Sequence, residues 1–395
     1  MKKVKAKKNL GQHFLEDLHA AEQIVDALNE NGEFKKVLEI GPGMGVLTQF
    51  LQNKKNFETH LLEIDSESVE YLKANFHEFP KENIHGVDFL RFPLEKITSF
   101  IGIKKGIENT NYLLKTKKTK YILTIFEKRV ANKDVPFFMK LMDLLNSAKI
   151  NCPKPIKNLE NKYLFKIKGK LACIVTFLDG KDKKILTTKN CYQVGTILAK
   201  MHQITKRFKI KRENSMGMKN MPKLLESINF KKIKFAKNIN KDLEKTFVEI
   251  KKSWPKNLPK GIIHGDLFID NIFFKKNKIS GIIDFYFASN EFYMYEVAIC
   301  INALCFDVKK NQFKINKHKV NSLLKGYEKV RKFTSNEKKY LNKLCLGSAF
   351  RYLLTRLYDF SNTPKTALIK IKDPREYYQK LLAHSQLKTF RDYLN

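Results

Sequence analysis

The residues with the clearest chemistry lie in one stretch, GIIHGDLFIDNIFFKKNKISGIIDFYFA, residues 261–288. It contains Asp266 and Asn271 in the spacing Asp-x4-Asn, and Asp284 beyond a short Lys/Asn turn. Phosphoryl transfer requires a carboxylate that orients the attacking hydroxyl and accepts its proton, and oxygen ligands that hold magnesium on the phosphates of ATP. We therefore assign Asp266 as the catalytic base, and Asn271 and Asp284 as magnesium ligands. The alternative is a surface loop whose Asp and Asn residues only cap the backbone. It would not explain why four features of a phosphoryl-transfer site occur together here.

The rest of this stretch is expected to position the site. Asp270 receives a structural role, because Asp in a loop commonly bonds nearby backbone amides, and His264 is interpreted as a packed anchor of the loop. The apolar runs predict a strand at 262–263 and a hairpin formed by 272–274 and 280–283. The second arm of this hairpin delivers the last carboxylate.

A glycine-containing segment upstream, GIKKGIENTNYLLKTKKTKYILTIFEK at residues 102–128, predicts two antiparallel strands. Gly102 and Gly106 mark its first turn, and residues 112–114 are expected to pair with 121–125. Kinase-like folds cover the phosphates of ATP with such a hairpin, although an ordinary hairpin explains this stretch equally well. The candidate ATP-binding residues are Gly106, Asn109, Asn111 and Lys128.

Seven motifs, in order along the chain, resemble the aminoglycoside-phosphotransferase and choline-kinase superfamily, and within it the bacterial homoserine kinases. They are GIENTNYLL, YILTIFEKR, PFFMKLMDLL, HGDLFIDNIFF, GIIDFYFA, AICINALCF and RYLLTRLYDFSNTP. The resemblance begins near residue 97 and runs to the C-terminus. It implies a protein-kinase-like two-lobe α+β fold and ATP-dependent phosphorylation of the L-homoserine hydroxyl, a step of threonine biosynthesis, with ATP and Mg2+ as cofactors.

The cation that holds ATP departs from the pattern of protein kinases, which pair a strand Lys with a helix Glu. Thr124 stands at the expected Lys position and Phe138 near the expected Glu. Lys128 and Arg129 are the candidates to replace the missing lysine.

The acceptor site is predicted on the helix FRYLLTRLYDFSNTP. Arg351, Arg356 and Asp359 suit the carboxylate and ammonium of an amino acid, because Arg binds a carboxylate in bidentate fashion. Tyr286 completes the candidate acceptor-binding set. An internal Arg–Asp pair that holds the helix is the alternative.

The first 97 residues carry a different pattern. An apolar run at 37–40 leads into the turn GPGMG at 41–45, and later strands are predicted to end at Glu63 and Asp88. A glycine-rich turn between strand and helix lets a ligand approach the backbone closely, and an acid about 20 residues on can accept both hydroxyls of a ribose. Asp88 suits an adenine amino group. Together these features predict S-adenosylmethionine, whereas the glycines alone are compatible with any doubly wound protein.

With KKNLGQHFL at residues 7–15, this segment resembles the N-terminal part of the ribosomal RNA adenine dimethyltransferases. The resemblance implies that the methyl-donor pocket is lined by His13, Leu15, Gly41, Glu63 and Asp88, although the family usually has Asn where His13 stands. The catalytic Asn-Leu-Pro-Tyr motif of that family does not occur after Asp88, so we do not expect methylation by this chain alone. We interpret the segment as a partial α/β Rossmann-like methyltransferase half-domain.

Length and composition set the remaining expectations. A chain of 395 residues accommodates two or more domains. Residues 1–97 hold 13 Lys and Arg against 16 Asp and Glu, whereas residues 98–395 hold 63 against 24, so the net charge of +36 arises downstream. We interpret this excess as solvated Lys, and RNA as a partner is not favoured. The predicted domains are 1–96, a truncated methyltransferase-like segment; 97–188, a kinase-like N-lobe; and 189–395, a helical C-lobe.

The sequence therefore predicts a cytoplasmic homoserine kinase that binds homoserine and ATP, has no membrane span and carries six buried free cysteines. The alternatives are a dimethyltransferase-type protein that binds S-adenosylmethionine and RNA, and a related kinase that acts on choline or an amino sugar. The oligomeric state is left open.

Overall fold

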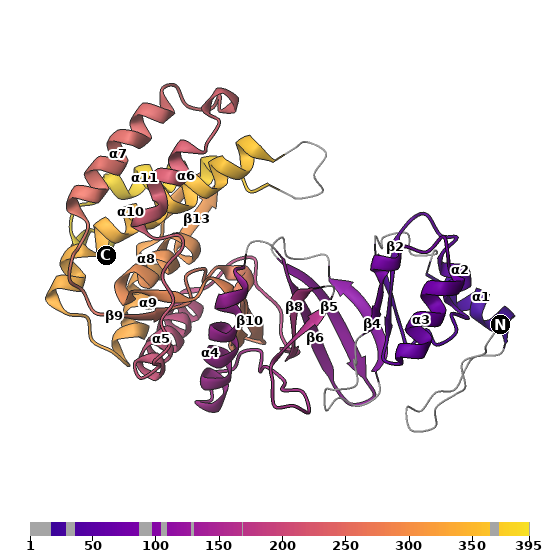
Figure 1. The fold of residues 1–395 in the computed structure, drawn as a ribbon. Helices are drawn as coiled ribbons and strands as arrows, with labels where there is room; N and C mark the ends of the chain where they lie inside the picture. Colours follow the sequence, from indigo (N-terminus) through magenta and orange to yellow (C-terminus); the bar gives the residue numbers. More distant parts are fainter. Residues whose placement is uncertain are drawn as a thin grey trace. The chain divides into compact units, whose positions relative to one another are not determined.

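The computed structural model describes residues 17–28, 36–86, 97–103, 109–127, 130–167, 169–363 and 371–394. The chain divides into two compact units, one of residues 1–136 with 154–177, the other of residues 137–153 with 178–395. Figure 1 labels their helices and strands. The domain boundaries predicted at 97 and 189 stay predictions, because the front segment and the first sheet fall in one unit.

The front segment forms a small parallel sheet with helices, as its pattern predicts. Its elements are α1 (Leu18–Asp26), β1 (Lys36–Ile40), α2 (Thr48–Leu51), β2 (Glu58–Glu63), α3 (Ser66–Asn75) and β3 (Ile84–Gly86), and the strand order is β1-β2-β3. Leu61, Leu72 and Ile84 form part of a core between the sheet and α3. This arrangement is consistent with a partial Rossmann-like region.

The same unit contains a five-stranded antiparallel sheet in the order β4-β5-β6-β8-β7. Its strands are β4 (Ile97–Ile103), β5 (Asn109–Thr116), β6 (Lys120–Phe126), β7 (Leu164–Ile167) and β8 (Lys170–Thr176). The predicted hairpin of β5 and β6 is present, but Gly102 is not in a turn. It lies inside β4 opposite Tyr112.

Side chains alternate between the two faces of this sheet because the strand period is two. Tyr112 pairs with Leu123, and Leu123 pairs with Ile174, so these three side chains share one face, which we call the apolar face. Asn111 pairs with Thr124 on the opposite face.

The second unit is mainly helical, and α4 enters it from the first. Its helices are α4 (Val135–Ser147), α5 (Thr188–Thr205), α6 (Met221–Glu226), α7 (Ile239–Ser253), α8 (Tyr293–Leu304), α9 (Lys317–Glu328), α10 (Ser335–Asn362) and α11 (Pro374–Ser385). Short antiparallel pairs join β9 (Lys260–Ile263) to β12 (Ser289–Phe292), β10 (Ile272–Lys275) to β11 (Lys278–Ile282), and β13 (Phe306–Lys309) to β14 (Gln312–Ile315).

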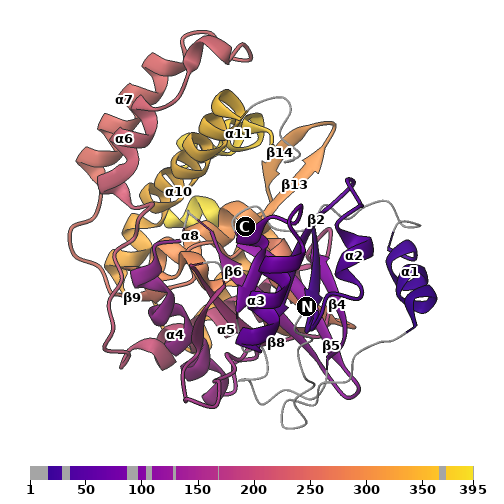
Figure 2. The same ribbon diagram turned by 45° about the vertical axis from the view of Figure 1, so that its right-hand side comes forward.

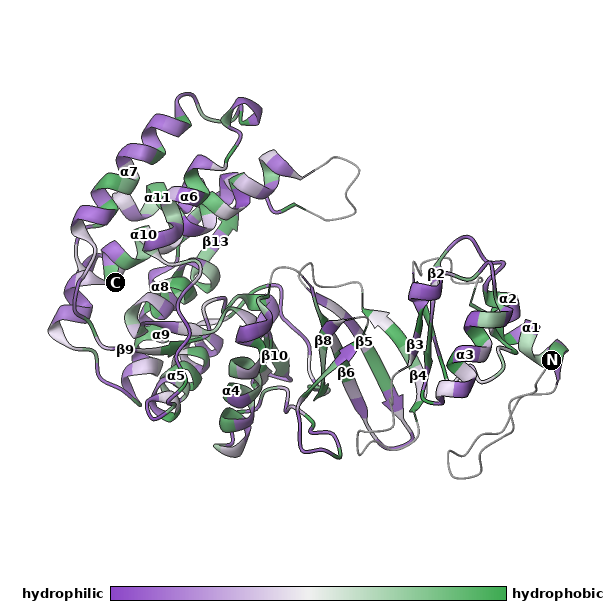
Figure 3. Cartoon of the chain, viewed as in Figure 1, coloured by the Kyte–Doolittle hydropathy of each residue, from purple (hydrophilic) through white to green (hydrophobic). Residues whose placement is uncertain are grey.

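Capping residues and apolar faces explain the helices that carry the site. Helix α10 starts with a reciprocal capping box between Thr334 and Glu337, which satisfies two of its free backbone amides. Figures 1 and 2 show α11 beside α10. Helix α8 is buried along almost its whole length, as its sequence YMYEVAICINAL requires. In Figure 3 the apolar strand β10 is mainly green, while α7 carries both purple and green turns.

Within the described ranges, no helix is both long enough and apolar enough to cross a membrane. All six cysteines are buried free thiols, in agreement with the prediction.

Candidate active site

A short loop after β9 carries the predicted base. Gly265 has a φ of +78°, and a Cβ there would lie 2.7 Å from the Phe287 carbonyl oxygen, so glycine alone fits this position. The Gly265 carbonyl accepts hydrogen bonds from Arg351 Nη1 (3.0 Å) and from the Tyr352 hydroxyl (3.0 Å). Two residues of α10 thereby hold the backbone immediately before Asp266.

The environment of Asp266 increases the proton affinity of its carboxylate. The Tyr352 hydroxyl donates to Asp266 Oδ1 at 3.1 Å. Burial raises the pKa of Asp266 above its ordinary value, while the Arg351 charge and the Tyr352 hydrogen bond oppose this rise. A base with a raised pKa accepts a proton more readily, which general base catalysis requires.

His264 is a neutral anchor of this loop, as predicted. Its Nε2 lies 2.9 Å from the Ile283 carbonyl oxygen, and the backbone N–H of Asp266 donates to its Nδ1 at 3.3 Å. Burial lowers the pKa of His264 to about 4. The ring therefore stays uncharged and links the loop to the end of β11.

The backbone brings the two predicted metal ligands to the same place. The N–H of Ile283 donates to the Asn271 carbonyl (3.0 Å), and Asp284 follows Ile283 directly. Asn271 Nδ2 donates to the Asp266 carbonyl at 2.8 Å, so the amide oxygen of Asn271 is the atom that can bind a cation. An amide oxygen and a carboxylate are hard donors, and Mg2+ is commonly held by one or two protein oxygens together with phosphates. The donor set therefore fits magnesium.

Glu296 of α8 is a residue of this site that the sequence patterns did not identify. It is fully buried, and its carboxylate accepts a hydrogen bond from the Gly265 N–H at 3.1 Å. Burial raises the pKa of Glu296 to about 7, although hydrogen bonds from the Gly265 and His264 backbone lower it. It holds the Gly265 N–H, whereas α10 holds the Gly265 carbonyl. A buried acid within YMYEVAIC was the available signal.

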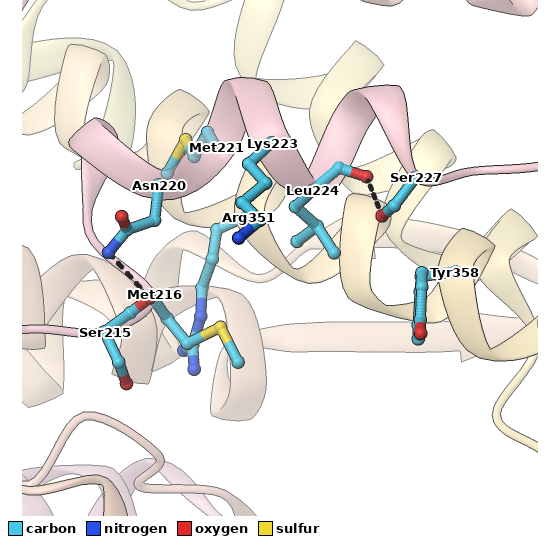
Figure 4. Close-up of a pocket in the computed structure, with 9 residues that line it drawn as sticks. All are labelled: Ser215, Met216, Asn220, Met221, Lys223, Leu224, Ser227, Arg351 and Tyr358. Carbon is cyan, nitrogen blue, oxygen red and sulfur yellow. Dashed lines mark hydrogen bonds between the residues drawn. The ribbon is translucent and has the colours of Figure 1, made fainter. Parts of the chain in front are cut away.

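A pocket of about 470 Å3 adjoins the loop through Arg351. Arg351 is only 4% exposed, and its Nε has no hydrogen-bond partner. Figure 4 shows its side chain, which comes from α10, among residues of the segment 215–227. The pocket is lined by Ser215, Met216, Asn220, Met221, Lys223, Leu224, Ser227, Arg351 and Tyr358.

The other candidate acceptor residues lie elsewhere in the second unit. Arg356 donates to Glu376 Oε2 (2.6 Å) and to the Asp373 carbonyl (3.0 Å), and it lies over the Tyr377 ring. Arg356 therefore belongs to an internal ion pair, with Glu376 rather than an Asp as its partner. Tyr286 packs edge-on against Phe138, and Asp359 does not line the pocket of Figure 4.

The predicted nucleotide residues are only partly described. Gly106, Lys128 and Arg129 lie outside the described residues. Thr124 donates from Oγ1 to Asn111 Oδ1 at 2.8 Å, and the Glu127 N–H donates to Asn109 Oδ1 at 3.3 Å. These bonds order the two asparagines within β5.

Phe138 of α4, at the position expected for a helix Glu, is fully buried. It packs edge-on against Phe137, and the Arg212 guanidinium lies 5.1 Å from its ring centroid. These are the contacts of a core residue.

The front segment retains a glycine turn supported by Glu63. The Glu63 carboxylate accepts hydrogen bonds from the backbone N–H groups of Gly43 (2.8 Å), Ile64 (2.8 Å) and Asp65 (3.0 Å). Gly41 has a φ of +68° and open space in front of it. Glu63 is only 2% exposed, so in this structure it holds the turn closed. The other predicted donor-site residues, His13, Leu15 and Asp88, lie outside the described residues.

Two family models match the chain. The model of the "Phosphotransferase enzyme family" matches residues 99–333, and that of "Ribosomal RNA adenine dimethylase" matches residues 3–135. The second match extends beyond residue 96, so the two overlap from 99 to 135.

Curated relatives agree with the first match. The homoserine kinase of Chelativorans sp. (strain BNC1) is 40% identical over 306 residues, which cover 77% of this chain and 94% of that protein. The homoserine kinase of Rhizobium meliloti (strain 1021) is 40% identical over 302 residues, which cover 76% and 92%. The chain belongs to the phosphotransferase enzyme family and, within it, to the homoserine kinase group.

Solved structures support the fold. An amicoumacin kinase in complex with AMP-PNP and Ca2+ has a TM-score of 0.59 at 15% identity, covering 76% of this chain and 90% of that one. The choline kinase of Streptococcus pneumoniae has a TM-score of 0.54 at 16% identity, covering 74% and 95%. The chain therefore has the mixed α+β, protein-kinase-like fold of these phosphotransferases.

Proposed function

We propose that this chain transfers the γ-phosphoryl group of ATP to the hydroxyl of L-homoserine. Asp266 orients the hydroxyl and accepts its proton as the oxygen attacks the phosphorus, and ADP leaves. Asn271 and Asp284 would hold Mg2+, which supplies positive charge against the phosphates. The observation that carries the proposal is the joining of these three residues in one loop system by His264 and Ile283. We also propose a cytoplasmic enzyme, because six buried free thiols suit a reducing compartment.

The acceptor assignment relies on Arg351 and on the relatives. Arg351 lines the pocket of Figure 4 and donates to the Gly265 carbonyl beside Asp266, while its Nε has no hydrogen-bond partner. We propose that Arg351 binds the acceptor carboxylate, which choline and amino sugars lack. Because Arg356 already binds Glu376, it is not part of this proposal.

The substitution Asp266→Asn tests the proposal. It removes the proton acceptor but keeps the shape, so we expect kcat to fall by roughly three orders of magnitude or more while ATP binding is retained. ADP release measured with homoserine, choline and an amino sugar gives the activity, and calorimetry gives ATP affinity. Full activity in the variant, or turnover of choline but not homoserine, would reject the assignment.

The second proposal concerns ligand binding by the front segment. We propose that it binds S-adenosylmethionine without methyl transfer, since the Glu63 carboxylate lies against a glycine turn and the catalytic motif of methyltransferases is missing. Calorimetric titration of the full chain with S-adenosylmethionine tests this. Glu63→Gln should weaken binding roughly tenfold or more, because a charged acceptor is lost. An absence of heat in both proteins would leave Glu63 with only its structural role.

A further inference from the structure

We propose that the front segment, residues 36–86, permanently covers the apolar face of the five-stranded sheet. It would then work as part of the phosphotransferase rather than as an independent domain. This inference does not depend on the phosphoryl-transfer chemistry proposed above.

The contact is made by Leu62 of β2 and Leu38 of β1 with the five-stranded sheet. Leu62 is 1% exposed, and the hydrophobic cluster that buries it also contains Tyr112, Leu114, Leu123 and Ile174. Leu38 of β1 packs against the same cluster. The two strands of the front segment thus contribute apolar side chains to a core that otherwise belongs to the five-stranded sheet.

Side chains alternate between the two faces of a strand, which explains how β2 contributes to two cores. Leu61 points into the core of the front segment itself, with Leu72 and Ile84. Leu62, the next residue, points to the opposite side and is absent from that core. The three-stranded sheet has two faces: helix α3 packs on the one that carries Leu61, and the other carries Leu38 and Leu62.

Charged residues at the start of β1 and β2 lie near the sheet as well. Lys36 and Glu58 form an ion pair at 2.6 Å. Burial raises the pKa of the Tyr112 phenol, and the Glu58 carboxylate raises it further. Burial works to raise the pKa of Glu127, but Lys170, Thr110 and Lys36 together hold it below its ordinary value. Polar contacts around an apolar centre are typical of a lasting interface.

The consequence is mutual dependence of the two parts. If Leu62 and Leu38 left the cluster, Leu114, Leu123 and Ile174 would lose part of their cover and meet water. Conversely, the front segment would expose the second face of its sheet. Opening of one part should therefore promote opening of the other.

Hydrogen–deuterium exchange of the full-length chain tests this coupling with Leu62→Asp. A charged group in the cluster should accelerate exchange in β5, β6 and β8 by roughly tenfold or more, because their protection then depends on a weakened cover. Helices α5 and α10 of the second unit serve as internal references. The matched control is Ile24→Asp, since Ile24 of α1 is 50% exposed and outside the cluster, and we expect exchange in β5, β6 and β8 to stay as in the wild type.

The milder variant Leu62→Ala keeps the test decisive if Leu62→Asp does not fold. It should accelerate exchange in the same three strands to a smaller degree. Faster exchange confined to residues 36–63, with β5, β6 and β8 unchanged in either variant, would overturn the proposal and leave the front segment an independent domain. Equal effects of Leu62→Asp and Ile24→Asp on these strands would overturn it too.

Discussion

At the scale of single residues, the site depends on how protein groups tune one carboxylate. Burial raises the pKa of Asp266, whereas the Arg351 charge and the Tyr352 hydrogen bond lower it. Because burial dominates, its pKa is raised. The pH at which activity is lost on acidification should therefore follow the pKa of Asp266.

The substitution Tyr352→Phe removes one hydrogen bond that favours the charged carboxylate. The pKa of Asp266 should then rise further, and the acidic limb of kcat/KM should move up by about half to one pH unit. Tyr377→Phe is the control, because the Tyr377 hydroxyl is buried without a hydrogen-bond partner although its ring packs 5.2 Å from that of Tyr352. Identical pH–rate profiles for all three proteins would contradict this role of Tyr352.

The proposed metal ligands give a second prediction at this scale. Asp284→Asn replaces a carboxylate by a neutral amide, so the Mg2+ concentration for half-maximal activity should rise roughly tenfold or more. Magnesium titration of ADP release measures it. Asp270→Asn is the control, because the Asp270 carboxylate belongs to the same loop but faces Lys372 at 3.9 Å. A comparable rise in both variants would argue against Asp284 as a specific ligand.

At the scale of elements, the loop that carries Asp266 is held by three other elements. Helix α10 holds the Gly265 carbonyl through Arg351 and Tyr352, and helix α8 holds its N–H through Glu296. The end of β11 holds His264. Because two of these contacts fix the backbone of Gly265 and the third fixes the His264 ring, the loop geometry tolerates little change.

Gly265→Ala tests this rigidity. The added Cβ would lie 2.7 Å from the Phe287 carbonyl in a left-handed conformation, so we expect a loss of about 2 kcal/mol in unfolding free energy together with a large loss of kcat. Gly169→Ala is matched, because Gly169 also has a left-handed φ of +71° but no atom within 4 Å of the new Cβ. It should cost about 1 kcal/mol and leave kcat intact. Urea denaturation and ADP release measure both effects.

At the scale of the whole molecule, buried glutamates and buried histidines change the unfolding free energy in opposite directions as the pH falls. Burial raises the pKa of Glu39 and Glu296 to about 7, so acidification from pH 7 to 4.5 protonates them in the folded chain and adds stability. Burial lowers the pKa of His264 to about 4, and of His202 and His384 to about 3. These histidines take up protons only in the unfolded chain below pH 6.5, which removes stability.

Each of these groups contributes roughly 2.5 kcal/mol between pH 7 and 4.5, so the three histidines outweigh the two glutamates. The unfolding free energy should therefore fall by about 2 kcal/mol from pH 7 to 4.5 and continue to fall at lower pH. Glu296→Gln removes one group that gains a proton in the folded chain on acidification. The unfolding free energy of this variant should therefore fall by about 3 kcal/mol more than that of the wild type between pH 7 and 4.5. Urea denaturation at pH 7, 5.5 and 4.5 measures this. Parallel profiles would show that Glu296 is not protonated in the fold.

The sequence by itself determined the local parts of this protein. The hairpin of β10 and β11, the loop with Asp266 and Asn271, and the glycine turn before α2 all follow from residues close together in the chain. Such features depend on backbone preferences and on strand periodicity, which neighbouring residues specify. The family motifs lie in the same local stretches.

Only the tertiary structure decided which distant residues complete the site. Arg351 and Tyr352 reach Gly265 across 86 and 87 residues, and Glu296 reaches it across 31. The sequence left Arg356 and Arg351 as equal candidates, and packing assigned Arg356 to Glu376. Likewise, Leu61 and Leu62 look alike in sequence but fill different cores. The physical reason is that contacts between remote elements depend on how whole helices and sheets pack, and no local spacing records that.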